Sequence, residues 1–192
     1  IEAAMWASEP IPFDPMEKTL HSIYQKTTST DNRRNFRMVH EYPLEGKPPM
    51  MTHVFENERG DRVISTKGAP EAILNASELS THERTEVNKI IESLAINGYR
   101  ILGVATAEMT GNNYPEKQQE LPFHFKGLVA FYDPPKENIR EVFNDFNEAG
   151  IIVKIITGDN ALTTKAIARQ AGVPDADMVI NGDELRKMDE KV

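Results

Sequence analysis

Small polar residues follow an apolar stretch near the end of the chain. The turn Thr157-Gly158-Asp159-Asn160 comes directly after the strand-like run Ile151–Ile156, and a helical pattern begins behind it. A buried strand that ends in such a turn presents hydroxyl, carboxylate and amide groups at the carboxyl edge of a sheet, where α/β proteins hold phosphate. Taken alone the turn is a weak signal, because Gly and Asp are also ordinary turn and cap residues.

A second segment offers a lysine in a related setting. Lys67 and Gly68 open the sequence Lys-Gly-Ala-Pro-Glu at the end of a predicted strand. The glycine permits a ligand to approach the backbone closely, and the lysine can reach a phosphate or a purine edge as a point charge. A solvated lysine before a turn is an equally good interpretation of these residues alone.

A third segment, Asp-Pro-Pro-Lys at 133–136, is stiff because both prolines fix φ. It fits either a hinge between two units or an ordinary helix start with Pro at the first position. The three segments together indicate nucleotide and phosphoryl chemistry.

Composition narrows the class of protein. The 192 residues are 39% hydrophobic and 27% charged, which is typical of a soluble globular protein. No apolar run approaches the ~20 residues of a membrane-spanning helix. The net charge of −8 argues against a nucleic-acid partner but leaves room for a nucleotide, which needs only a few local cations. The absence of cysteine excludes disulfides, thiolate zinc sites and cysteine nucleophiles.

Other catalytic patterns are missing. No two histidines lie four residues apart on a helix beside a third ligand, so the sequence predicts no metal site. There is no Gly-x-Ser-x-Gly hydrolase elbow and no Walker-type phosphate loop. The five histidines are His21, His40, His53, His82 and His124.

The first part of the chain predicts an antiparallel sheet with flanking helices. Apolar residues at helical spacing follow Asp14 and Pro15, and again after residue 86, whereas β-rich runs alternate with good turns. The predicted helices are 16–27, a short one after Gly68, and 87–95; the predicted strands are 36–44, 50–56, 62–66 and 100–109.

The pattern changes near residue 125. A strand at 127–131, a helix at 137–149, a strand at 151–156 and a helix at 161–171 predict a parallel sheet with crossover helices. This part, ~65 residues, is too short for a complete doubly wound sheet. We therefore expect a partial sheet whose unpaired edge favours self-association with a neighbouring chain.

The order of Lys-Gly-Ala-Pro-Glu, Asp-Pro-Pro-Lys and Thr-Gly-Asp-Asn resembles the large cytoplasmic region of P-type cation-transporting ATPases, over essentially the whole chain. It resembles the ion-pumping branch rather than the heavy-metal branch, whose His-Pro signature is absent. The resemblance implies a nucleotide-binding domain at 1–125, with an antiparallel sheet and flanking helices. It implies part of a phosphorylation domain at 126–192, with a haloacid-dehalogenase-like Rossmannoid α/β fold.

The resemblance also assigns roles to single residues. Tyr42 is similar to the aromatic residue that stacks on adenine, Glu17 to the acid that receives the adenine amino group, and Arg100 to the arginine at the polyphosphate. Tyr42 and Lys47 lie in Tyr-Pro-Leu-Glu-Gly-Lys, where the family has Phe-x-Ser-x-Arg-Lys. The implied nucleotide-binding residues are Glu17, Tyr42, Lys47, Lys67, Gly68 and Arg100; the implied hinge is Asp133, Pro134, Pro135 and Lys136; the implied catalytic residues are Thr157, Gly158 and Asp159.

By the same resemblance the parent protein uses ATP and Mg²⁺ to form an aspartyl-phosphate and moves a cation across a membrane. The chain is then a soluble cytoplasmic fragment whose partners are ATP and the pump's other domains and membrane helices. Both ends of the chain read as cut from a larger protein. The phosphorylated Asp-Lys-Thr-Gly-Thr segment is expected before Ile1 and the magnesium-binding Gly-Asp-Gly-x-Asn-Asp segment after Val192, so we expect ATP binding without hydrolysis.

Two alternatives stay open at this point, and the transported cation cannot be read from the sequence. A free-standing phosphatase of the haloacid-dehalogenase type with a large cap would need a catalytic aspartate pair at a strand end, which the chain lacks. A non-catalytic interaction domain would lack an adenine cleft.

Overall fold

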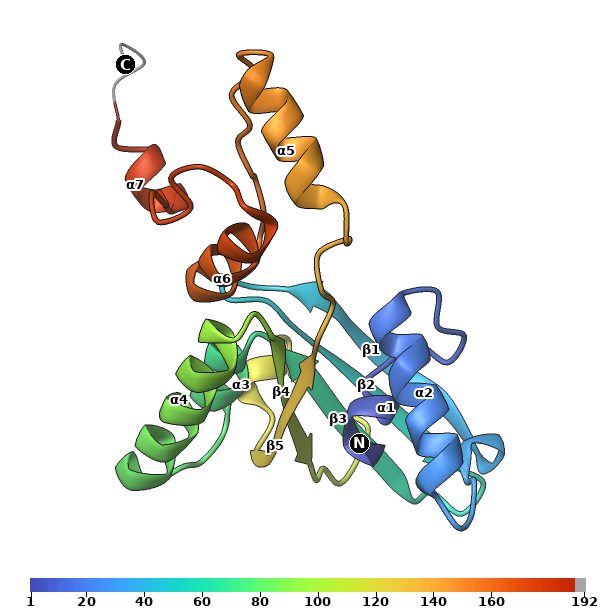
Figure 1. Ribbon diagram of the computed structural model, residues 1–192. Helices are drawn as coiled ribbons and strands as arrows, with labels where there is room; N and C mark the ends of the chain where they lie inside the picture. Colours follow the sequence, from blue (N-terminus) through green and yellow to red (C-terminus); the bar gives the residue numbers. More distant parts are fainter. Residues whose placement is uncertain (189–192) are drawn as a thin grey trace. The chain divides into compact units, whose positions relative to one another are not determined.

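The computed structural model describes residues 1–188, which form two compact units (Figure 1). Unit 1 comprises residues 1–88 and 101–130; unit 2 comprises residues 89–100 and the chain from 131 onward. The chain leaves unit 1 for the last time between residues 130 and 131, just before the segment 133–136. The domain boundary near residue 125 stays a prediction.

A five-stranded sheet in the order β1-β2-β3-β4-β5 is the centre of the first unit (Figure 1). The pairs β1–β2, β2–β3 and β3–β4 are antiparallel, as expected from the β-rich runs that turns separate. The strands are β1 (Phe36–Glu45), β2 (Met50–Asn57), β3 (Arg62–Gly68), β4 (Arg100–Ala107) and β5 (Phe123–Phe131). The mixed fold of sheet and flanking helices confirms the predicted fold class.

Alternation along β2 divides the side chains between the two faces of the sheet. On one face, Phe55 packs with Met5 and Trp6 of α1 (Glu2–Trp6) and with Tyr24 of α2 (Pro15–Thr27). On the other face, Val54 belongs to a larger core that includes Ile73 of α3 (Pro70–Ala76). Two short 3₁₀ turns, Arg33–Asn35 and Gln118–Glu120, complete this part.

Two helices of the first part begin at side-chain caps. The Asp14 carboxylate accepts hydrogen bonds from the backbone N–H of Met16 at 2.8 Å and of Glu17 at 3.3 Å, and Pro15 occupies the first helical position. Ser80 and Glu83 form a reciprocal capping box before α4 (Thr81–Ile96). The cap at Asp14 matters for the site, because it places Glu17 in the first turn of α2.

Unit 2 contains the helices α5 (Ile139–Glu148), α6 (Ala161–Ala171) and α7 (Gly182–Leu185). The first two confirm the predicted helices. The Asn160 side chain caps α6 by accepting from the N–H of Leu162 at 2.8 Å, and Gly172 ends it at φ +76°.

The predicted strand at 151–156 is wrong. This segment has no regular structure, and Ile152 and Ile156 are 85% and 98% exposed. A strand needs a hydrogen-bonding neighbour, and none lies beside this segment within residues 1–188. The predicted strand at 127–131 is instead the end of β5 in the antiparallel sheet, so no parallel sheet forms in the described part of the chain.

None of the helices in residues 1–188 has the length and apolar character needed to cross a bilayer.

Candidate functional site

A buried ion pair joins β3 to α2 on the face of the sheet that α1 and α2 cover. The Lys67 ammonium donates a hydrogen bond to Oε1 of Glu17, and the two side chains are only 8% and 9% exposed. The structure therefore brings together two of the residues that the sequence assigned to nucleotide binding. Oε2 of Glu17 is buried and has no hydrogen-bond partner among the described residues.

The loop after α1 holds this pair in place. The Lys67 ammonium also donates to the Ser8 hydroxyl at 2.8 Å, and that hydroxyl donates in turn to the carbonyl of Ala4 at 2.9 Å. The backbone N–H of Glu9 donates to Oε1 of Glu17 at 3.4 Å. Ser8 and Glu9 were not among the predicted site residues, because nothing in their local sequence marks a contact with residues 17 and 67.

Burial and charge act in opposite directions on the lysine. Burial lowers the pKa of the Lys67 ammonium from its ordinary value, and the hydrogen bond and charge of Glu17 raise it. The charges of Asp14 and Glu9 also raise this pKa. The charge on the Lys67 ammonium therefore depends on the neighbouring carboxylates. A bound polar ligand could partly replace these carboxylates as its partners.

A glycine is needed at position 68 because another part of the chain's own backbone passes very close to it. A Cβ atom at this position would lie 2.5 Å from the carbonyl oxygen of Pro49 and 2.6 Å from Cα of Met50. The neighbouring N–H of Ala69 donates to that same carbonyl of Pro49 at 2.9 Å. The close approach at Gly68 is therefore made by the turn between β1 and β2, and its predicted contact with nucleotide stays a prediction.

Tyr42 lies on the opposite face of the sheet from Lys67. It pairs with Thr52, whereas Lys67 pairs with the adjacent Met51, whose side chain points the other way. The Tyr42 ring is 5% exposed within the larger core, and its hydroxyl donates to the carbonyl of Pro115 at 2.6 Å. The structure thus does not bring Tyr42 together with Glu17 and Lys67.

An irregularity in β1 explains this placement. Met38 is opposite Phe55, but His40 is opposite Val54, so the register shifts by one residue between them. Met38 accordingly packs on the α1–α2 face, while the side chains from His40 onward change faces. Tyr42 would share the face of Met38 if the strand were regular.

Arg100 and Asp159 lie close together within unit 2. Nε of Arg100 is 3.3 Å from Oδ1 of Asp159, and the two side chains are 56% and 31% exposed. The backbone N–H of Asp159 also donates to the hydroxyl of Thr157 at 3.0 Å, and Gly158 has open space around it. Arg100 and Asp159, which were both predicted to lie near the phosphates of the nucleotide, are therefore partly exposed neighbours.

The remaining predicted residues lie apart from these groups. Lys47 is exposed in the turn between β1 and β2. The predicted hinge forms an irregular segment between β5 and α5, and it consists of Asp133, Pro134, Pro135 and Lys136.

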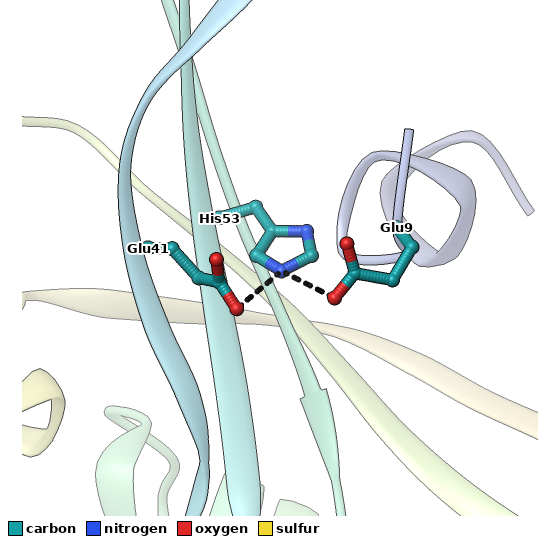
Figure 2. Close-up of side chains that lie close together, drawn as sticks. All are labelled: Glu9, Glu41 and His53. Carbon is teal, nitrogen blue, oxygen red and sulfur yellow. Dashed lines mark ion pairs between the residues drawn. The ribbon is translucent and has the colours of Figure 1, made fainter. Parts of the chain in front are cut away.

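A second polar cluster borders the ion pair. His53 on β2 is completely buried, and its Nε2 lies 3.9 Å from Oε1 of Glu9 and 3.9 Å from Oε1 of Glu41 on β1 (Figure 2). Burial lowers the pKa of the His53 imidazole, while the two carboxylates and the Ser8 carbonyl raise it. The sequence did not predict this cluster, because Glu9, Glu41 and His53 are far apart along the chain and form no local motif.

A cavity lies at the other end of β3 from Lys67. Its lining includes Glu56 and Arg62 and the loop 107–112 after β4. Arg62 is already engaged there, with Nε 2.8 Å from Oε2 of Glu56. Among the described residues that line this cavity, Arg62 is the only Lys or Arg, and it is already paired.

Comparison with known proteins identifies the family. A family profile described as "P-type ATPase, cytoplasmic domain N" matches residues 13–138, which include both Glu17 and Lys67. The chain belongs to this family of N domains.

Relatives of this N domain agree with that assignment. It is 29% identical over 192 residues to a calcium-transporting ATPase of Bacillus subtilis, covering 93% of this chain and 22% of the relative. It is 31% identical over 172 residues to the sodium/potassium exporting P-type ATPase cta3 of Schizosaccharomyces pombe, covering 83% of this chain and 17% of the relative. The chain thus spans about a fifth of the length of these relatives, which are named for different ions.

Proposed function

We propose that this N domain is the ATP-binding part of a cation-transporting P-type ATPase. The observation that carries the proposal is the buried pair of Lys67 and Glu17, within the region that matches the family profile. A buried pair of this kind costs desolvation energy, so a role in binding is a better reason for its presence than stability is. The relatives, which are named as ATPases, favour this function over a phosphatase or an interaction domain.

Glu17 and Lys67 would receive the adenine end of the nucleotide. The adenine amino group is a hydrogen-bond donor, and Oε2 of Glu17 is a buried acceptor without a partner among the described residues. Glu9 and Glu41 add negative charge nearby, which disfavours a triphosphate at this point. Lys67 would keep one hydrogen bond to Glu17 and donate another to the base.

The resemblance implies that Arg100 contacts the polyphosphate. The Arg100 guanidinium, now paired with Asp159, is exposed enough to contact a polyphosphate. In the parent protein Thr157, Gly158 and Asp159 would approach the transferred phosphoryl group, with Mg²⁺ as the counter-ion of the triphosphate. The segment Asp133–Lys136 would serve as the hinge.

The activity of the parent is part of the same proposal. ATP hydrolysis through an aspartyl-phosphate would drive cation transport, with this chain on the cytoplasmic side and the other domains and membrane helices as its partners. The chain contains no Asp-Lys-Thr-Gly-Thr segment, so it should bind ATP without hydrolysing it. Stacking of adenine on Tyr42 and contact with Lys47 stay predictions.

Self-association is a separate prediction, now centred on the exposed apolar residues of 151–156. Sedimentation velocity at rising concentration tests it: a constant monomer would contradict it, and a concentration-dependent dimer abolished by Ile156→Asp would support it.

Calorimetric titration of the chain with ATP tests the proposed binding site. We expect Lys67→Met to weaken binding by about tenfold or more, because a charge-assisted hydrogen bond is lost. Lys126→Met, at an exposed lysine of β5, is the matched control and should bind ATP as the wild type does. Equal affinities for all three proteins, with folding confirmed by circular dichroism, would contradict the proposed site.

A further inference from the structure

The imidazole of His53 is placed like a metal ligand. Its side chain is completely buried, and Figure 2 shows its Nε2 pointing between the carboxylates of Glu9 and Glu41. The three ligand atoms, one from each residue, lie within 4.8 Å of one another. Because they come from the loop after α1, from β1 and from β2, the fold itself assembles the cluster.

The hydrogen bond on the other side of the ring determines the tautomer. Nδ1 of His53 is 3.1 Å from the carbonyl oxygen of Ser8, and a carbonyl can only accept a hydrogen bond. Nδ1 therefore carries the proton, which leaves a lone pair on Nε2 in the neutral ring. A histidine that binds metal through one nitrogen commonly donates its other N–H to a carbonyl in this way.

Nε2 is buried and has no hydrogen-bond partner within residues 1–188. The two nearest groups are carboxylates, which accept hydrogen bonds as the neutral Nε2 does, so they cannot satisfy it. Leaving such an atom unpaired costs free energy. Three electron-pair donors thus face one another around a common point, where a cation would satisfy all of them.

We propose that His53, Glu9 and Glu41 bind one divalent cation of the zinc class. Imidazole together with carboxylates suits Zn²⁺ and its neighbours Co²⁺ and Ni²⁺, whereas Mg²⁺ and Ca²⁺ prefer ligand sets made of oxygen alone. Three protein ligands leave a fourth tetrahedral position for water. The site shares no ligand side chain with the proposed nucleotide contacts, although a bound cation would offset the negative charge of Glu9 and Glu41 beside them.

The distances fit an ion after a small closure. Zinc ligands at about 2.0–2.1 Å in tetrahedral geometry are separated from each other by about 3.3 Å. Nε2 is 3.9 Å from each carboxylate oxygen, about half an ångström more than this, and all three ligand atoms lie within 4.8 Å of one another, so the carboxylates must move inward. The Glu9 and Glu41 side chains are 31% and 39% exposed, so they are free to make this movement while His53 stays fixed.

The neighbouring lysine does not oppose a cation strongly. The Lys67 ammonium is already neutralised by Glu17, and the loop of Ser8 and Glu9 lies between that pair and His53. A bound ion would attach this loop to the sheet through Glu9.

Titration of the chain with Co²⁺ and then Zn²⁺ tests the proposal, with Co²⁺ absorbance and calorimetry as readouts. The wild type should bind one equivalent, and intense tetrahedral Co²⁺ bands should disappear when Zn²⁺ displaces the ion. We expect Glu9→Gln and Glu41→Gln each to weaken binding by about tenfold or more. Glu45→Gln, at an exposed glutamate of the same strand as Glu41, is the matched control and should not change binding.

Imidazole nitrogen NMR supplies a readout that does not require a destabilising change at His53. Added Zn²⁺ should shift Nε2 of His53 and leave Nδ1 protonated. The proposal is overturned if no saturable binding occurs, if both glutamine variants bind as tightly as the wild type, or if the shifts fall on His82 or His124 instead.

Discussion

Breaking the buried ion pair from one side should destabilise the protein strongly. In Lys67→Met the Glu17 carboxylate keeps its position, 9% exposed, but loses its cation and the hydrogen bond from the Lys67 ammonium. Removing one partner of such a pair typically costs about 3–5 kcal/mol, because a charge is left buried without compensation. This is a large part of the stability of an ordinary domain, about 5–15 kcal/mol.

Removing both partners should cost much less than the sum. In Lys67→Met with Glu17→Leu no charge remains buried, and apolar replacement of a buried pair is often neutral or stabilising. The interaction term of the double-mutant cycle should therefore be about 3 kcal/mol or more. Glu45→Gln, an exposed change, should leave stability within about 0.5 kcal/mol.

Urea denaturation followed by tryptophan fluorescence measures these changes in stability near the ion pair. Trp6, the single tryptophan, packs beside the site with its ring 5.0 Å from that of Phe55, so its fluorescence reports on this part of the fold. With a slope of about 2 kcal/mol per molar urea, Lys67→Met should lower the midpoint by about 1.5–2.5 M. A decrease below about 0.5 M, or additive effects in the double variant, would refute the description of the pair as buried and coupled.

Two further predictions follow from local geometry. Gly68→Ala should destabilise the chain by about 1–3 kcal/mol, measured by the same urea titration, because its Cβ would lie 2.6 Å from Cα of Met50; an unchanged midpoint would contradict this close approach. The hydrogen bond from Arg33 lowers the pKa of Asp31 from 3.8 to about 2, so the stabilisation from this pair should be present above pH 3.8 and be lost as pH falls through about 2. Carboxyl carbon NMR of the wild type and Arg33→Ala checks the shift; a pKa of Asp31 that does not rise in the variant would contradict the assigned cause.

The strands of the first part were predictable because their sequence signals are local. β-rich runs separated by turns located β1, β2 and β3 to within two residues at their ends. The strand prediction at Ile151–Ile156 was wrong because its signal was incomplete. An apolar pattern indicates a tendency to be buried, but a strand also needs a partner strand, which the pattern does not supply. Helix α1 was missed because five residues are too few to show a helical period.

The site was predictable only where a motif marks it. Lys67 and Glu17 were each predicted to contact nucleotide through a family resemblance, and the structure places them in contact with each other, while their role in binding stays a prediction. The face occupied by Tyr42 depends on a register shift after Met38, which has no reliable signature in a single sequence. The contacts of His53 with Ser8 and Glu9 depend on the loop after α1, and only folding brings this loop next to β2.

The most direct test of the central claim is a map of amide chemical shifts during an ATP titration of the unmodified chain. The account predicts saturable changes that are largest at Ser8, Glu17 and Lys67, because a base bound between the last two must alter the hydrogen bonds of all three. No saturable change at millimolar ATP, or changes that centre on the cavity near Arg62, would contradict nucleotide binding at this pair.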